Sequence, residues 1–443
     1  MQHIYKFIDK WKVFFLILSC NMPNPYIGTV AAGLFLCFVA MTRLRIHHRT
    51  EWDQINFCWF LIFIIPVLSF LANFSHLNNL FWYVFTTVPI LIYPAVLSNV
   101  PYENVLNSFK KFVLLELAVF STQYMWLAVK FRTLNPLAVD LSAGDFIAGT
   151  SVGYSSLMSV TMAFLTLFFL DHYFFTKKRA GLVYSFLCFM MMILTGYMAG
   201  IVLFFISIIL NFISNISYSM VRLKLSKLQM ILSITMLLAF SVLCMQMSSN
   251  VIYASKVIIK IFSASPPLKV QSYIVTFSDF LKENPEQSIL GVGGGNYSSR
   301  AAFMTGGQYL QPSNPWYVPV TPSRFYNRYM SPLFEKRFLY KTIGNVSSRS
   351  MINTPFSQIQ TIFSEGGLLS LIILFALSIM CIRIYLRKMS RMYLIAIILF
   401  FSLLLIDNWL AFPNFAFLFW VTLFFNDFSA GKRDLTARWR TQN

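Results

Sequence analysis

The residue types best suited to chemistry in this chain are the basic side chains of one long polar segment. Between residues 249 and 352 the sequence carries eleven lysines and arginines but only four acids. Arginine side chains bind phosphate oxygens in a paired, planar geometry. Arg324 and Arg328 have the spacing of neighbours on one face of a helical turn. The segment predicts a site for an anion, with anchoring of Arg, Tyr and Trp at a membrane surface as the alternative.

A glycine-rich stretch, LGVGGGNYSSR (290–300), lies within this segment. It follows an amphipathic pattern at 269–284, which predicts a helix lying on the membrane or on other helices and ended by Pro285. Glycines at 291 and 293–295 allow the backbone to turn sharply and to approach another segment closely. A simple hinge is the alternative interpretation. No strand–turn–helix unit and no GK[ST] sequence indicates a nucleotide loop.

Carboxylates inside the apolar runs are a second group of candidates, since a carboxylate within a membrane is costly. Glu116 lies in the middle of one apolar run, Glu365 begins another, and Asp407 lies near the end of a third. The five histidines and the acids do not form a metal-ligand cluster, so the sequence predicts no metal and no cofactor. The six cysteines fall in apolar runs and predict no disulfide framework.

The elements that must position these residues are membrane-spanning helices. The chain is 57% hydrophobic and 12% charged, whereas soluble domains have about 25% charged residues. A membrane-spanning helix needs about 20 apolar residues. On this basis the sequence contains twelve predicted spans. They cover residues 5–20, 25–42, 55–74, 79–98, 111–129, 148–171, 181–196, 198–216, 229–248, 366–386, 391–408 and 411–427. For the short pair 181–196 and 198–216, a re-entrant hairpin is the alternative.

The distribution of charge predicts the orientation. Lysine and arginine concentrate in the connections on one side, as cytoplasmic loops do, so both termini are predicted to be cytoplasmic. The predicted fold is an all-α polytopic membrane protein. It has transmembrane helices 1–9 in residues 1–248, a large and partly helical outer loop in 249–365, and helices 10–12 with a basic tail in 366–443. The net charge of +19 reflects topology and binding of anionic lipid or phosphate, and does not indicate nucleic acid.

Together these features resemble the bacterial O-antigen polymerase and ligase superfamily of polytopic membrane glycosyltransferases. That family has a basic residue before an amphipathic helix, a glycine-rich turn and a long periplasmic loop. A late span then begins with His, Asn/Ser/Gln, nine residues, Gly, two residues and a small residue. Here Lys269 stands near the family's basic residue, GVGGGNY (291–297) matches the turn, and Ser357 to Ser370 matches the late motif. AGTSVGYSSLMSVTMAF (148–164) and TGYMAG (195–200) resemble two upstream family segments.

Two positions depart from the family pattern. Phe356 stands where the ligases have the histidine proposed to activate the acceptor hydroxyl, and Met198 stands where the family has an arginine. The resemblance, which covers residues 145–385, implies a GT-C-like architecture. It favours a polymerase over a ligase, located in the bacterial inner membrane with an active site that faces the periplasm.

The activity that the resemblance implies is transfer of a growing glycan from undecaprenyl diphosphate to a second lipid-linked repeat, without a metal. Positive charge near the diphosphate would stabilise it as it leaves, and a carboxylate would take the acceptor proton. The residues assigned on this hypothesis are Arg324, Arg328, Glu335 and Glu365 for catalysis, Arg349, Arg300, Lys269 and Arg132 for the diphosphate, and Gly291, Gly293 and Gly295 for the turn.

The expected partners are the undecaprenyl-diphosphate-linked oligosaccharide, membrane lipids and a chain-length regulator protein. Two other activities are alternatives: a ligase that joins the finished glycan to a lipid A–core acceptor, and a flippase or other transporter of lipid-linked oligosaccharide. Secondary transporters usually have internal repeats. None is visible in this sequence, and the single large outer loop also fits a transporter poorly.

Overall fold

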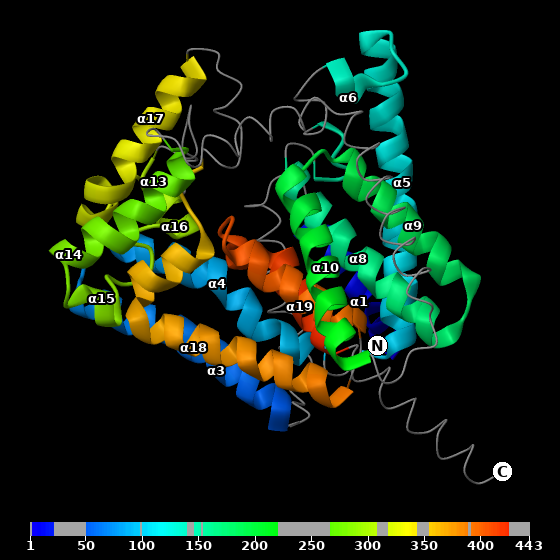
Figure 1. Ribbon diagram of the computed structural model, residues 1–443, viewed down its shortest axis with the longest axis horizontal. Coiled ribbons are helices and arrows are strands. Elements are labelled where there is room, and N and C mark those ends of the chain that lie inside the picture. The colour runs from blue at the N-terminus through cyan, green and yellow to red at the C-terminus, as the bar shows by residue number, and fades with distance from the viewer. Residues whose placement is uncertain are drawn as a thin grey trace. The chain divides into compact units, whose positions relative to one another are not determined.

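The computed structural model describes residues 2–21, 50–97, 100–139, 146–151, 154–219, 266–307, 318–342, 354–388 and 391–424. Every regular element in these ranges is a helix (Figure 1). Five of the described helices are long and apolar enough to cross a membrane, namely α3 (Thr50–Ala72), α4 (Leu77–Leu97), α5 (Tyr102–Phe131), α8 (Ser155–Thr176) and α18 (Gln358–Lys388). The chain is therefore a helical membrane protein, as its composition predicts.

The remaining predicted spans are less well defined. Two of them, 25–42 and 229–248, lie outside the described residues. In the others the apolar stretch that the structure describes is shorter than a full span. These stretches are Trp11–Cys20 in α1 (Gln2–Cys20), α9 (Arg179–Leu194), Met198–Asn211 in α10 (Met198–Ser219), Met392–Leu404 in α19 (Arg391–Leu404) and the helix Pro413–Phe424. The number twelve and the GT-C-like architecture stay predictions.

The chain divides into two compact units, and each is built from stretches far apart in the sequence. Unit 1 consists of Met1–Asn24, Tyr102–Ile258 and Ser390–Leu399, and unit 2 of Pro25–Pro101, Ile259–Met389 and Phe400–Asn443. The described part of the predicted outer loop thus shares a unit with α3, α4 and α18. The boundaries at 248 and 365 divide the chain by membrane topology, and they stay a prediction.

In unit 1, a buried carboxylate positions the turn that leads into α8. The backbone N–H of Thr150 donates to Glu116 Oε2 at 2.9 Å, and its hydroxyl donates to Glu116 Oε1 at 2.6 Å. The side-chain amide of Gln123 forms two further hydrogen bonds with the backbone of Gly149. Glu116 therefore has a structural partner within its own unit, which explains a carboxylate in the middle of an apolar run.

In unit 2, the predicted amphipathic helix at 269–284 is confirmed. It consists of α13 (Leu268–Ile274), η1 (Val275–Phe280) and α14 (Leu281–Glu283), joined without a break in the helical backbone. One face is buried through Leu268, Thr276 and Phe280. The middle part is a π-helix, a form that frequently occurs at functional sites.

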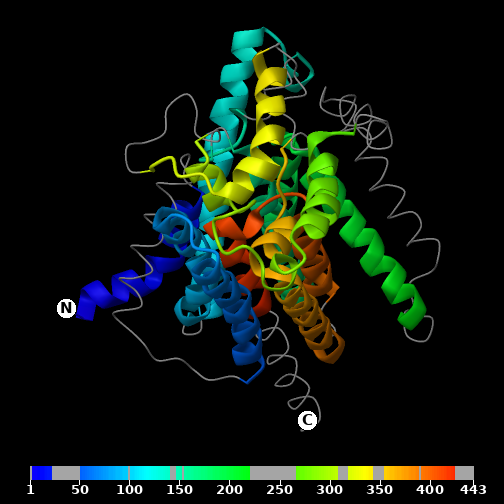
Figure 2. The same cartoon turned by 90° about the vertical axis from the view of Figure 1, so that its left-hand side faces the viewer.

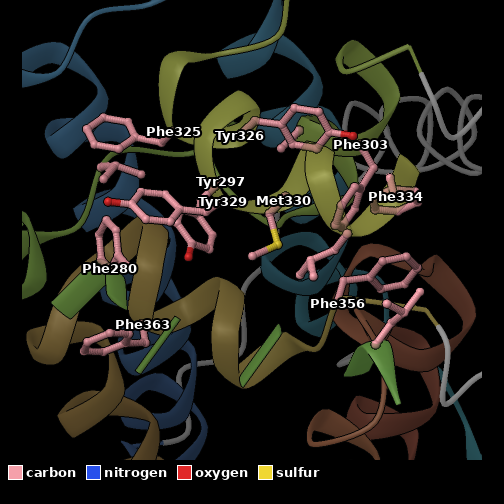
Figure 3. Packing of buried hydrophobic residues seen from close by; sticks show 14 residues of the cluster. Phe280, Tyr297, Phe303, Phe325, Tyr326, Tyr329, Met330, Phe334, Phe356 and Phe363 are labelled. Carbon is pink, nitrogen blue, oxygen red and sulfur yellow. The ribbon is translucent and has the colours of Figure 1, made fainter. Parts of the chain in front are cut away.

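The helices that follow gather at one end of α3 and α18, as both views show (Figures 1 and 2). Aromatic side chains of these helices pack together in a hydrophobic core (Figure 3), in which Tyr326 is 1%, Phe325 5% and Tyr329 5% exposed. Aromatic faces in a polar segment such as 300–349 can receive sugar rings. These three have a different role, because their rings pack against Phe280, Tyr297 and Phe303. The helices that gather at this end are α15 (Gln287–Leu290), α16 (Arg300–Thr305), η2 (Tyr326–Met330) and α17 (Ser331–Thr342).

The glycine-rich stretch, here called the glycine loop (291–295), lies between three membrane-spanning helices. Gly293 has a φ of +93°, and a Cβ atom there would overlap the backbone of Phe70 in α3. Gly295 has a φ of +81°, and a Cβ atom there would overlap the backbone carbonyl of Asn79 in α4. Side chains are excluded at both positions by conformation and by space. The glycine loop is therefore a close-packing element and not a hinge.

The third membrane-spanning helix beside the glycine loop is α18, and it is broken where the loop meets it. Gly367 has φ 70° and ψ −176°, which is not helical, and such a break removes the preceding carbonyls from the regular hydrogen-bond ladder. Two of these carbonyls accept hydrogen bonds from the loop: Val292 N–H donates to Ser364 O at 2.9 Å, and Gly293 N–H to Glu365 O at 3.1 Å. The loop thus completes the interrupted helix.

Replacing Gly293 with alanine should lower the free energy of unfolding by more than about 3 kcal/mol, because left-handed strain and a backbone overlap act together. Thermal denaturation of the detergent-purified protein measures this effect. Ile289→Ala is the matched control, since Ile289 is 60% exposed in the neighbouring turn. Its effect should stay within about 0.5 kcal/mol. Equal midpoints for the two variants would contradict the packing described here.

Candidate functional site

The best-defined polar feature of unit 2 is the carboxylate of Glu365, which lies fully buried inside the glycine loop and the turn after it. Its Oε2 accepts a hydrogen bond from the Gly295 N–H at 2.8 Å. Its Oε1 accepts from the N–H groups of Tyr297 at 3.0 Å, Ser298 at 3.0 Å and Ser299 at 2.8 Å. Successive backbone N–H groups of this kind form a concave anion site. Here the anion belongs to the protein itself.

This arrangement gives Glu365 a structural role. A hydrogen bond to a charged group contributes about 1.5–3 kcal/mol, and both oxygens of Glu365 are engaged. The glycine loop therefore has no free N–H face with which to bind a phosphate. Glu365 is one of the two carboxylates that the sequence suggests as a catalytic base. In the structure both of its oxygens are already bound by N–H groups of the main chain.

The loop that Glu365 holds leads directly to Arg300, the first residue of α16. Ser299 caps this helix, because its side chain accepts a hydrogen bond from the Ala302 N–H at 3.2 Å. Arg300 is only 5% exposed, and its guanidinium carbon lies 4.1 Å from the ring centroid of Phe412. The position of this buried cation is thus set by the same turn that surrounds Glu365.

Lys269, at the start of α13, is a second buried cation and is 8% exposed. Its ammonium group donates a hydrogen bond to the carbonyl of Phe356 at 2.8 Å and another to the carbonyl of Ile406. Burial lowers the pKa of Lys269 to about 8, while the nearby negative charge of Asp407 acts to raise it and Arg337 acts to lower it further. The side chain is therefore protonated at neutral pH.

Asp407 links these cations to one another. It is 6% exposed, in the turn before η5 (Trp409–Ala411), and its Oδ1 accepts a hydrogen bond from the Asn408 N–H at 2.7 Å. The charges of Lys269, Arg300 and Arg337 act on this carboxylate. We call these four residues the basic cluster. Lys269, Arg300 and Asp407 are buried, and Arg337 is half-buried. Three cations and one carboxylate leave two positive charges, which is an electrostatic environment suited to a doubly charged anion.

The structure places Arg324 and Arg328 on the surface of unit 2, where both are exposed. The guanidinium carbon of Arg324 lies 4.6 Å from the ring centroid of Phe325. Arg328 forms an ion pair with Glu283 at 2.8 Å, in which the two side chains are 65% and 43% exposed. An exposed pair of this kind contributes little to stability. Arg328 is therefore already paired with a carboxylate of the protein, whereas its spacing from Arg324 suggests that both arginines bind an external anion.

The other predicted site residues have separate positions. Glu335 is exposed on α17, and its carboxylate accepts a hydrogen bond from the Ser331 hydroxyl at 3.3 Å. Arg132 is exposed at the end of α5 with a φ of 51° and belongs to unit 1. Arg349 lies outside the described residues. Only Lys269 and Arg300, of the basic residues singled out from sequence, are part of the basic cluster.

Phe356, in the place of the ligase histidine, belongs to the aromatic core of unit 2. Its ring centroid lies 4.6 Å from that of Phe303 and 6.3 Å from that of Phe334 (Figure 3). The side chain carries no group that could take a proton. Its backbone carbonyl instead binds the ammonium group of Lys269.

Sequence reasoning missed Arg337 and Asp407 as members of a site. Arg337 was one of eleven basic residues in its segment, and its spacing set it apart in no way. Asp407 did carry a signal, since an acid at the end of an apolar run needs a partner. What the sequence lacked was the identity of that partner, because Lys269 and Asp407 are separated by more than a hundred residues.

Comparison of this chain with known protein families, with proteins of described function and with solved structures finds no match.

Replacing Glu365 with glutamine should strongly destabilise unit 2. The amide keeps the shape of the side chain, but one of its two ends carries hydrogens that would face N–H donors of the loop. We expect a loss of about 3–5 kcal/mol, the usual cost of removing one partner of a buried charged interaction. Limited proteolysis and thermal denaturation measure it. Glu335→Gln, at an exposed carboxylate of the same unit, should change stability by less than about 0.5 kcal/mol.

The lowered pKa of Lys269 also predicts a pH dependence of stability. An unfolded lysine has a pKa of about 10.4, so between pH 8 and that value the unfolded chain binds more protons at this site than the folded chain. The contribution of Lys269 to the free energy of unfolding therefore rises with pH in that window, by roughly 3 kcal/mol in total. Denaturation of the wild type and Lys269→Met should show this difference growing from pH 8 to 10. A constant difference would show that Lys269 titrates normally.

Proposed function

We propose that the protein is a membrane glycosyltransferase that polymerises a surface polysaccharide such as O-antigen. The observation that carries the proposal is the basic cluster, whose two excess positive charges lie in the unit that contains α3, α4 and α18. A polyprenyl-diphosphate-linked glycan combines an apolar tail with a doubly phosphorylated headgroup. Such a substrate needs a site for phosphate beside membrane-spanning helices, and the proposed location is the periplasmic side of the bacterial inner membrane.

In the proposed reaction, the diphosphate headgroup of the donor occupies the basic cluster. A hydroxyl of the acceptor sugar attacks the anomeric carbon of the donor glycan. The new bond joins that carbon to the acceptor oxygen, and the bond between the carbon and the diphosphate breaks. Negative charge grows on the leaving diphosphate, so Lys269, Arg300 and Arg337 stabilise the transition state more than the ground state.

The acceptor hydroxyl loses its proton in this reaction. Of the two carboxylates that the sequence assigns to catalysis, Glu365 is fully engaged with the backbone of the glycine loop. Glu335 remains as the assigned base, and an oxygen of the departing diphosphate is the alternative proton acceptor. Full activity of Glu335→Gln would indicate that the diphosphate takes the proton. A loss of activity of about 10²-fold or more, which is typical for removal of a general base, would indicate that Glu335 takes it.

The choice of a polymerase over a ligase depends on Phe356. A ligase of the family that this sequence resembles uses a histidine at that position, and here an aromatic side chain in a packed core replaces it. A deletion strain distinguishes the two activities. Loss of a polymerase leaves lipopolysaccharide with a single repeat on the core, whereas loss of a ligase leaves the core bare.

The proposal predicts that the cations of the basic cluster matter more than the exposed arginines Arg324 and Arg328. Arg300→Gln and Arg337→Gln should each reduce chain extension by about 10²- to 10³-fold, as expected for loss of a charge aimed at a developing anion. The assay is incubation of purified protein with one lipid-linked repeat, followed by separation of the products by length. Folded protein is scored by size-exclusion chromatography before each assay.

Arg324→Gln and Arg328→Gln are the matched controls, because these arginines are exposed and lie in the same unit. Retention of activity in these two variants, together with its loss in the Arg300 and Arg337 variants, supports the basic cluster as the diphosphate site. The opposite result would favour the exposed arginines that the sequence suggested. Extension by all four variants at the wild-type rate would rule out both sites.

A further inference from the structure

The short helix α15 exposes two apolar side chains although it belongs to the segment that the sequence assigns to an aqueous loop. Ile289 is 60% and Leu290 54% exposed. The residue before them, Ser288, is buried, with its hydroxyl bonded to the Asn284 carbonyl at 2.8 Å. The helix therefore turns Ser288 inward and both of its apolar side chains outward, which is the reverse of the pattern expected in water.

Two contacts place α15 against membrane-spanning helices. The hydroxyl of Ser69, in the last turn of α3, donates a hydrogen bond to the Leu290 carbonyl. The backbone of Ile289 lies so close to Gly367 of α18 that a Cβ atom on this glycine would overlap it. The side chains beside these contact points are themselves apolar and exposed: Leu68 and Leu71 in α3, and Leu368 and Leu369 in α18. The apolar surface of both helices thus continues onto α15.

The length of α18 indicates the depth of this contact. Its candidate span, Gln358–Ile384, is broken at Gly367, and the residues buried just before the break are mostly polar. The continuous apolar part, residues 368–384, has 17 residues and would measure about 26 Å as a helix, close to a hydrocarbon core of about 30 Å. Gly367 and the α15 residues beside it therefore lie where the acyl chains of one leaflet begin.

The backbone after α15 also meets the requirement for irregular chain at that depth, where every polar group needs a partner within the protein. The N–H groups of residues 291–294 donate to the carbonyls of Gln287, Ser364, Glu365 and Pro66 in turn. The N–H groups of residues 295 and 297–299 donate to the Glu365 carboxylate, and that of residue 296 donates to the Gly293 carbonyl. All nine consecutive donors are satisfied without water.

We propose that α15 and the glycine loop form a re-entrant element, in which Ile289 and Leu290 are inserted among the phospholipid acyl chains of one leaflet. The exposed charged residues Lys282 and Glu286 mark the side on which the segment enters from water. The segment then passes through the glycine loop to Arg300. This lipid contact does not depend on the glycosyltransferase activity proposed above.

Fluorescence quenching in nanodiscs tests the insertion. Ile289→Cys, in a background without the six native cysteines, is labelled with an environment-sensitive fluorophore. We expect loss of emission with phosphatidylcholine that carries a nitroxide near the headgroup end of its acyl chain, and little quenching by iodide. Leu71→Cys is the control for a lipid-facing position and Lys282→Cys the control for water. Quenching of the Ile289 label by iodide to the level of the Lys282 control would overturn the proposal.

A second measurement uses the native cysteine background and does not depend on the fold of that variant. A benzophenone amino acid at position 289 or 290 should form covalent adducts with phospholipid on irradiation, identified by mass spectrometry. Cross-links to a second copy of the chain, in place of lipid, would mean that α15 lies in a protein interface. Adducts with neither would mean that it lies in water. Both of these results contradict insertion into the bilayer.

Discussion

The interaction on which unit 2 depends most is the burial of the Glu365 carboxylate within a turn of backbone N–H groups. An isolated carboxylate at this position would be very costly, since a buried charge needs hydrogen bonds or a counter-charge. Four N–H groups supply them. Because those donors come from residues 295 to 299, the carboxylate fixes the course of the chain between the glycine loop and α16. The break in α18 at Gly367 and the glycines at 291, 293 and 295 let the loop approach its neighbouring helices closely enough to make this contact.

Unit 1 contains a smaller arrangement of the same physical kind. Glu116 accepts two hydrogen bonds from Thr150, beside a glycine with a φ of +59°. In both units a carboxylate in an apolar helix holds a glycine-containing turn, and in both the turn leads into another helix. Acids within apolar runs of this chain therefore have structural partners, and their presence alone does not identify a catalytic base.

The consequence for function concerns which charges are available. Glu365 engages the anion-binding backbone turn of the glycine stretch, so in the function that we propose the phosphate is bound by side chains. In that proposal the basic cluster supplies them, with Asp407 as its single carboxylate. The same turn that encloses Glu365 places Arg300 at the first position of α16. A structural carboxylate thus positions a cation that we assign to the substrate.

Several features of this protein could be determined from the sequence alone, because they depend on local pattern. Apolar runs predict the membrane-spanning helices, and the spacing of apolar residues predicts the helix at 269–284. Glycine at 293 and 295 indicates a backbone that a side chain would obstruct. The sequence also singled out Lys269 and Arg300 as basic residues near a turn, although it ranked the exposed Arg324 and Arg328 above them.

Only the tertiary structure decided how these pieces meet. The role of Glu365 depends on N–H groups about seventy residues earlier in the chain, and Arg337 and Asp407 acquire a meaning only beside Lys269 and Arg300. Aromatic residues that could have received sugar rings are instead packed in a core. The physical reason is that hydrogen bonds and charge interactions depend on distance in space. Residue type and spacing determine which partners a side chain requires, while the fold determines which partner it has.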